Sequence, residues 1–173
     1  HHQLENVMRP LAIFIALCTA TPVMAADLLV VFQDSSPKDR LIIYNEGCEV
    51  GPAVVTLDLT SAAQGVFFDT ISGGQGQGVS HEPEVVEGNA TFAPVADGDQ
   101  ILNISMNGLQ PLGSVTITFD VDDTDSSRQI VVNGSEFEGS SVTIQIGENA
   151  QTASIGADGR TNVIFEDTIC VSS

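Results

Sequence analysis

Four aspartates stand within six residues of this chain, and their type and spacing suit them to binding a cation. They are Asp120, Asp122, Asp123 and Asp125. Four negative charges this close repel one another unless they point apart into water or share a cation. Carboxylate oxygens are ligands that Ca²⁺ prefers, so the stretch predicts a calcium site. If other loops lie at the same end of the fold, we expect the site to include Asp34, Asp39 or Glu46.

The alternative is an acidic turn that is simply solvated. The stretch does not match a helix-loop-helix calcium loop: counted from Asp120, Asp125 occupies the position that needs Gly, and Val131 the one that needs Glu. The calcium hypothesis therefore rests on the crowding of charge.

A β-strand must position these aspartates. Val115, Ile117 and Phe119 alternate with Thr116 and Thr118, which is the period of a half-buried strand with one face in the core. The other face should be solvated and end in the carboxylates.

The rest of the chain repeats this pattern and predicts an all-β fold. About ten short apolar or alternating runs are separated by turn residues at the spacing typical of sandwiches, and no run has helical periodicity. We expect a single antiparallel β-sandwich, including a strand over 130–132. The glycine-rich segment 72–78 should be a flexible hairpin tip, and 45–47 a turn in which Asn45 and Gly47 suit positive φ.

The N-terminal part predicts export. Residues 1–7 precede Met8-Arg9, an apolar run covers 11–18, and Val23-Met-Ala25 has the small residues of a cleavage site, so 8–25 are predicted to be a signal peptide. A buried helix is the alternative, disfavoured by Pro10 and Pro22. The sandwich domain should span 26–173, secreted or periplasmic. It contains no apolar run long enough for membrane insertion.

The charge of the chain limits the classes of partner that it can bind, and its cysteine content indicates the cellular compartment. The chain has 5 Lys plus Arg against 23 Asp plus Glu, a net charge of −18, which excludes nucleic acid and anionic lipid as partners. Once Cys18 leaves with the signal peptide, Cys48 and Cys170 remain, and we predict a disulfide between them; two free buried thiols are the alternative.

No pattern in the sequence predicts an enzyme. His81 is the one histidine of the predicted mature chain, and it lacks the second histidine of a zinc protease and the Gly-x-Ser-x-Gly turn of a serine hydrolase. We expect it to be an exposed strand residue. A hydrolase is the least favoured class.

Several short segments resemble small secreted bacterial proteins named for similarity to the core of the sponge aggregation factor. The segments are 27–32, Ser36-Pro-Lys-Asp-Arg40, Asn45-Glu-Gly-Cys48, Leu57-Asp-Leu59, Phe68-Asp-Thr70 and Phe119-Asp-Val-Asp-Asp-Thr124. The resemblance implies calcium-dependent, carbohydrate-linked cell adhesion.

Two functions are therefore expected ahead of a hydrolase. The first is a calcium-binding adhesion or extracellular interaction module, whose partner is a cell-surface or matrix protein or a glycan. The second is a structural secreted or matrix subunit without a specific ion. The sequence leaves the ligand and the oligomeric state open.

Overall fold

The computed structural model describes residues 25–124, 132–165 and 170. These residues form twelve strands: β1 (Ala26–Gln33), β2 (Asp39–Asn45), β3 (Ala53–Asp58), β4 (Phe67–Phe68), β5 (Glu84–Glu87), β6 (Ala90–Phe92), β7 (Ile101–Met106), β8 (Ser114–Phe119), β9 (Val121–Asp122), β10 (Ser141–Ile146), β11 (Asn149–Ser154) and β12 (Arg160–Phe165). The residues expected to precede the domain lie outside this range, except Ala25.

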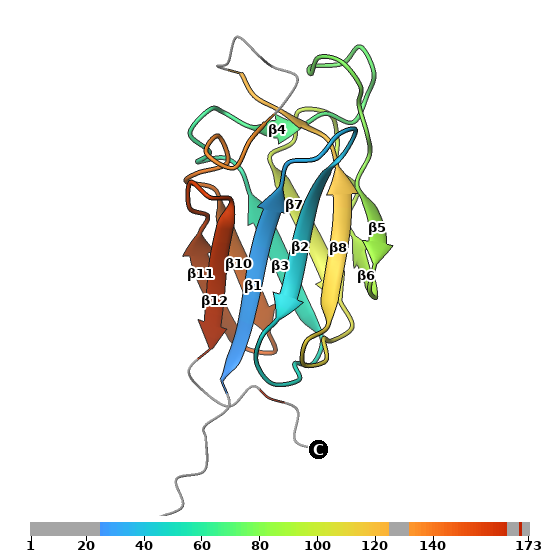
Figure 1. The fold of residues 1–173 in the computed structure, drawn as a ribbon. Coiled ribbons are helices and arrows are strands. Elements are labelled where there is room, and N and C mark those ends of the chain that lie inside the picture. Colours follow the sequence, from blue (N-terminus) through green and yellow to red (C-terminus); the bar gives the residue numbers. More distant parts are fainter. Residues whose placement is uncertain (1–24, 125–131, 166–169, 171–173) are drawn as a thin grey trace, which may run out of the picture.

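Ten of the strands form two five-stranded sheets that lie face to face, as Figure 1 shows. The first sheet has the order β12-β1-β2-β8-β5 and the second β11-β10-β3-β7-β6, with every pairing antiparallel. The two remaining strands, β4 and β9, pair as a separate two-stranded ribbon. The predicted all-β sandwich is confirmed.

At each lateral edge of the sandwich, a connection passes from the edge strand of one sheet to the edge strand of the other. β5 and β6, consecutive in the chain, are edge strands of different sheets, and so are β11 and β12. Gly88 makes the first of these connections with φ of +85°, a conformation that an L side chain adopts only with strain. The edge strands β5 and β6 have only four and three residues, and such short edge strands limit pairing with another chain.

One hydrophobic core lies between the sheets, filled by the alternate residues that the sequence pattern predicts. In β8, Val115, Ile117 and Phe119 are almost completely buried. The prediction that the other face of β8 is solvated was wrong, because Thr116 and Thr118 are only 7% and 6% exposed. β8 is an inner strand between β2 and β5, and Thr116 donates a hydrogen bond of 3.3 Å to Glu87 of the neighbouring strand.

Two other local expectations differ from the structure. Of the strand expected over 130–132, only Val132 is described, and it is buried without being in a strand. In the 45–47 turn neither Asn45 nor Gly47 has positive φ. The Asn45 side chain holds this turn instead, accepting a hydrogen bond of 3.0 Å from the Gly47 amide. No helix in the described ranges is long and apolar enough to cross a membrane.

Candidate functional site

The four-aspartate stretch begins where β8 ends, at the end of the sandwich that carries β4 and the long loops (Figure 1). Asp120 separates β8 from β9, Asp122 lies in β9, and Asp123 follows it. Asp125 lies outside the described residues. Asp122 and Asp123 are each 2% exposed. The alternative of a solvated turn was therefore wrong for these two residues.

Pairing of β9 with β4 brings in an aspartate that the sequence analysis missed. Asp122 lies opposite Phe67, and Asp69 follows β4 directly. The Asp69 amide donates to the Asp120 carbonyl at 3.0 Å, and the Asp69 side chain is 1% exposed. An edge-to-face contact at 5.3 Å between the rings of Phe68 and Phe119 holds these two segments together.

A second aspartate, Asp97 in the β6–β7 connection, reaches the same place. Its carboxylate accepts hydrogen bonds from the backbone amides of Gln75 at 2.7 Å and Thr70 at 3.1 Å. These donors, Gln75 first, lower the pKa of Asp97. Asp97 therefore stays ionised more readily than an ordinary aspartate, and its carboxylate holds the backbone of the glycine-rich segment at Gln75.

The glycine-rich segment 72–78 lies over the carboxylates. Gln77 donates its amide hydrogen to Asp122 Oδ2. At Gly76, a Cβ atom would lie 2.3 Å from Asp122 Oδ2 and 2.4 Å from Asp69 Oδ2. Both carboxylates thus pack against the same glycine, and only a residue without a side chain fits this close approach.

On the other side of Asp120 lie two more carboxylates, from Asp34 in the β1–β2 loop and from Asp39, the first residue of β2, so these loops do lie at the same end as the four-aspartate stretch. Both residues and Asp120 line a small cavity of about 150 Å³. Glu46 does not join them, because it lies at the opposite end of the sandwich, where its carboxylate accepts a hydrogen bond from Asn162 at 3.3 Å. We define the acidic end by Asp34, Asp39, Asp69, Asp97, Asp120, Asp122 and Asp123.

Burial raises the pKa of four of these carboxyl groups. For Asp39, loss of hydration is the largest cause and the charges of Asp120 and Asp34 add to it, so its pKa is about 8. Burial, followed by the charges of Asp122 and Asp69, raises the pKa of Asp120 to about 7. The pKa values of Asp69 and Asp122 also rise, again mainly because of burial.

Cationic side chains do not compensate this charge within the described ranges. The ion pair found there joins Lys38 to Glu84 at 3.0 Å on the surface. Asp39, Asp69, Asp120 and Asp122 have no described ion-pair partner. The described residues also contain no group of three or more His, Cys, Asp or Glu side chains placed to hold a metal ion.

His81 lies in the loop before β5, half-buried, rather than on an exposed strand. Its backbone amide donates to the Asp69 carbonyl at 3.1 Å, and Ser80 Oγ donates to Asp69 Oδ2 at 2.9 Å. His81 Nε2 is buried with no hydrogen-bond partner in the described part of the chain. Ser80, His81 and Asp69 are thus neighbours without the hydrogen bonds of a catalytic triad.

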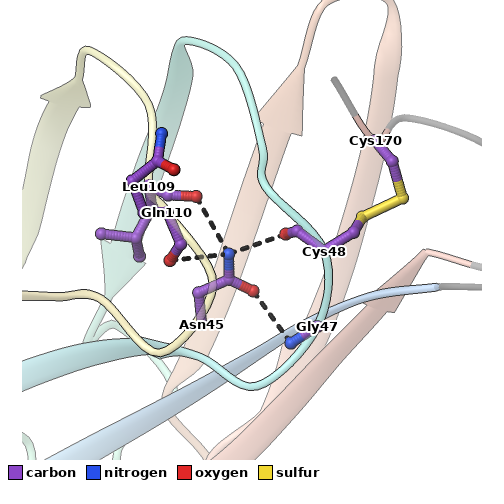
Figure 2. Close-up of a disulfide and its surroundings, with 6 residues drawn as sticks. All are labelled: Asn45, Gly47, Cys48, Leu109, Gln110 and Cys170. Atoms are coloured by element: carbon purple, nitrogen blue, oxygen red, sulfur yellow. Dashed lines mark hydrogen bonds between the residues drawn. A yellow bond between two sulfur atoms is a disulfide. The ribbon is translucent and has the colours of Figure 1, made fainter. Parts of the chain in front are cut away.

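The opposite end holds the predicted disulfide, which is confirmed. Cys48 and Cys170 are bonded with their Cα atoms 5.6 Å apart, and the bond spans 122 residues (Figure 2). Beside it, Asn45 Nδ2 donates to the carbonyls of Cys48, Leu109 and Gln110 at 2.7, 2.9 and 3.1 Å. This network joins the β2–β3 and β7–β8 connections.

Comparisons of this chain with protein-family models, with curated proteins and with solved structures found no match.

Proposed function

We propose that this protein is an extracellular interaction module that binds Ca²⁺ at its acidic end, where the ion holds the loops in a conformation that contacts a cell-surface or matrix protein or a glycan. The disulfide fits an extracellular or periplasmic compartment, where such bonds persist. The resemblance of short segments to proteins named for the sponge aggregation factor core points to the same class.

One observation carries the proposal. Four aspartates with raised pKa values, Asp39, Asp69, Asp120 and Asp122, crowd one end without an ion-pair partner in the described part of the chain. Buried carboxylates without compensation cost free energy, which protonation or a bound cation removes. A divalent cation compensates two of them at once, and Ca²⁺ accepts the flexible, oxygen-rich coordination that loops provide.

The second candidate is a structural secreted or matrix subunit that uses no specific ion. The observation that favours it is that the described residues contain no group of three or more potential ligands placed around one point. In that case the buried carboxyl groups remain protonated, and salt acts on the protein only by screening its net charge.

Thermal unfolding distinguishes the two candidates. We expect the oxidised protein to melt several degrees higher in millimolar Ca²⁺ than in EDTA, because a ligand at about one hundred times its Kd adds roughly 2.7 kcal/mol to the free energy of unfolding. Mg²⁺ and NaCl at matched ionic strength are the controls. The Asp122→Asn/Asp123→Asn variant should lose the Ca²⁺ response. Equal melting temperatures of the wild type in all salts would reject calcium binding in favour of the structural role.

The adhesion part of the proposal has its own readout. Beads coated with the protein should aggregate with one another, or bind to cells or matrix, in Ca²⁺ and disperse in EDTA. If Ca²⁺ raises the melting temperature but beads never associate, the ion stabilises the protein without an adhesive role.

A further inference from the structure

The edge strands of the two sheets differ in how well they are protected against pairing with another chain. β5 and β6 have four and three residues, and β5 has a bulge between Val85 and Glu87. β12 has six residues and begins with the charged Arg160. Short length, bulges and charged side chains are the features with which proteins prevent strand pairing at an edge. β11 has none of these features.

β11 is a regular edge strand without a charged residue. Its six residues pair with β10 in an unbroken register, and five of the six are exposed. The strand contains no Lys, Arg, Asp, Glu or Pro. In Figure 1 it lies at the outer margin of the second sheet, next to β12 of the other sheet. β11 has one neighbouring strand in its sheet within the described ranges, so its other side presents a row of backbone donors and acceptors.

The turn that precedes β11 determines which backbone groups face outwards. β10 and β11 are joined by the two-residue turn Gly147-Glu148, and Gly147 has φ of +58°, as the first residue of a type II′ turn requires. The pair that flanks such a turn, Ile146 and Asn149, exchanges two hydrogen bonds, and every second pair along the strands does the same. The backbone groups of the residues in between therefore point away from β10. These residues are Ala150, Thr152 and Ser154.

The distribution of charge indicates the partner that this edge accepts. A net charge of −18 makes the approach of two copies unfavourable over most of the surface. β11 is an exception, because the nearest charged residues along the chain are Glu148 before it and Asp158 after it, and the adjoining β10 is also uncharged. A foreign partner attracted by charge would bind the acidic surface instead. A second copy meets no like charge on these two strands.

We propose that two copies of this chain associate by antiparallel pairing of β11 with β11 about a two-fold axis. Every pairing within the two main sheets is antiparallel, and this one would join the second sheets of the two copies into a continuous sheet. An antiparallel pair of identical strands is symmetric, as an isologous dimer requires. The register that uses all three outward-facing residues places Thr152 opposite Thr152 of the second copy. The inference goes beyond the proposed function and requires no calcium.

Sedimentation velocity of the oxidised full chain in EDTA tests the inference. A pair of six-residue strands is a small interface, so we expect a weak dimer whose share increases with protein concentration. The share should also increase with NaCl concentration, because salt screens the repulsion between two anionic copies.

Opposite charges introduced at Thr152 test the two-fold pairing directly. Thr152→Lys and Thr152→Glu each place two like charges opposite one another across the axis, with about 5.5 Å between the Cα atoms. Each variant alone should dimerise about fivefold more weakly than the wild type. An equimolar mixture of the two variants should dimerise again, because lysine then faces glutamate. Recovery in the mixture also shows that both variants are folded.

Gln145 provides matched controls on the neighbouring strand. It is exposed on β10 and lies opposite Ala150 in the register of the hairpin, one strand inward from the open edge. Gln145→Lys and Gln145→Glu change the charge of the chain by the same amount as the two Thr152 variants. Each control should dimerise like the wild type, and mixing the two should bring no gain.

Two results would overturn the inference. A wild type that stays monomeric up to millimolar concentration in high salt leaves the edge to a strand from another protein. A wild-type dimer that tolerates both charges at Thr152 is formed through a different surface. Neither result bears on the calcium proposal, since every measurement is made in EDTA. In turn, a protein whose melting temperature does not respond to Ca²⁺ can still form this dimer.

Discussion

The two ends of this sandwich bury polar groups in opposite ways. At the disulfide end, Asn45 is completely buried and uses both parts of its amide, which donates to three carbonyls and accepts from Gly47 (Figure 2). At the acidic end, Asp69 is equally buried, but its carboxyl group lies beside other carboxyl groups, and burial together with the charge of Asp97 raises its pKa. An amide carries both donor and acceptor, whereas an ionised carboxylate only accepts.

The difference separates a structural end from a candidate binding end. A neutral amide that satisfies its neighbours needs nothing from solution and stabilises the connections around it. Crowded carboxylates need a proton or a cation, so the state of the acidic end depends on the composition of the solvent. We therefore expect changes at the disulfide end to act under all conditions, and changes at the acidic end to act only at particular pH values or ion concentrations.

The largest effect should follow from loss of the disulfide. The Cys48→Ser/Cys170→Ser variant loses the restriction of a 122-residue loop in the unfolded chain, which is worth roughly 4–5 kcal/mol in the chain-entropy picture. Thermal unfolding should show a melting temperature lower by about 10 °C or more, with and without Ca²⁺. A change of only one or two degrees would mean that the disulfide contributes little to stability.

For Asn45→Ala we expect a smaller loss of stability, a decrease of about 3 kcal/mol in the free energy of unfolding. The substitution leaves three carbonyls and the Gly47 amide without the partners that the side chain supplies. Urea unfolding at several pH values should give the same loss throughout. Asn149→Ala, in an exposed position of β11, is the control and should stay within about 0.5 kcal/mol of the wild type. Equal stability of the two variants would contradict the role given to Asn45.

The smallest effect, and one confined to a pH range, is expected for Asp39→Asn. The pKa of Asp39 is about 8 in the folded protein against an ordinary value of 3.8, so folding favours its protonated form. Its contribution to stability is complete below about pH 4 and is lost as the pH rises through about 8. In EDTA the wild type should therefore melt at progressively lower temperatures from pH 5 to pH 9.

The variant should show a flatter profile over the same range, because asparagine stays neutral and keeps an acceptor for the Ser35 amide. The two melting temperatures should be closest at pH 5, with the variant gaining over the wild type by a few degrees at pH 9. Parallel pH profiles would show that Asp39 does not titrate in this range.

Local pattern was enough to predict part of the candidate site. The alternation of Val115, Ile117 and Phe119 predicted a strand, and its continuation into Asp120 and Asp122 predicted carboxylates at the strand's end. Two cysteines in a chain with an export pattern predicted their bond. Such features depend on periodicity and residue type, which are properties of short stretches of sequence.

Asp69 and Asp97 could not be found in the same way. Asp69 is the one aspartate of its loop and Asp97 shares its loop only with Asp99, and both are far along the chain from Asp122. Only the pairing of β4 with β9 and the hydrogen bonds of Asp97 to the glycine-rich segment bring them together. The one sequence feature that could have drawn attention to Asp69 is its position, directly after two phenylalanines and shortly before the glycine-rich segment. The burial of Thr116 and Thr118 was missed for a related reason, because it depends on which strand lies beside β8.

By itself, the sequence determined the strands, the core residues, the cysteine pair and the strong negative charge, because hydrophobic periodicity and composition act locally or over the whole chain. The tertiary structure decided which carboxyl groups meet, which of them are buried and which of their pKa values rise. These properties depend on neighbours from distant segments, since desolvation and charge repulsion are set by what surrounds a group in space.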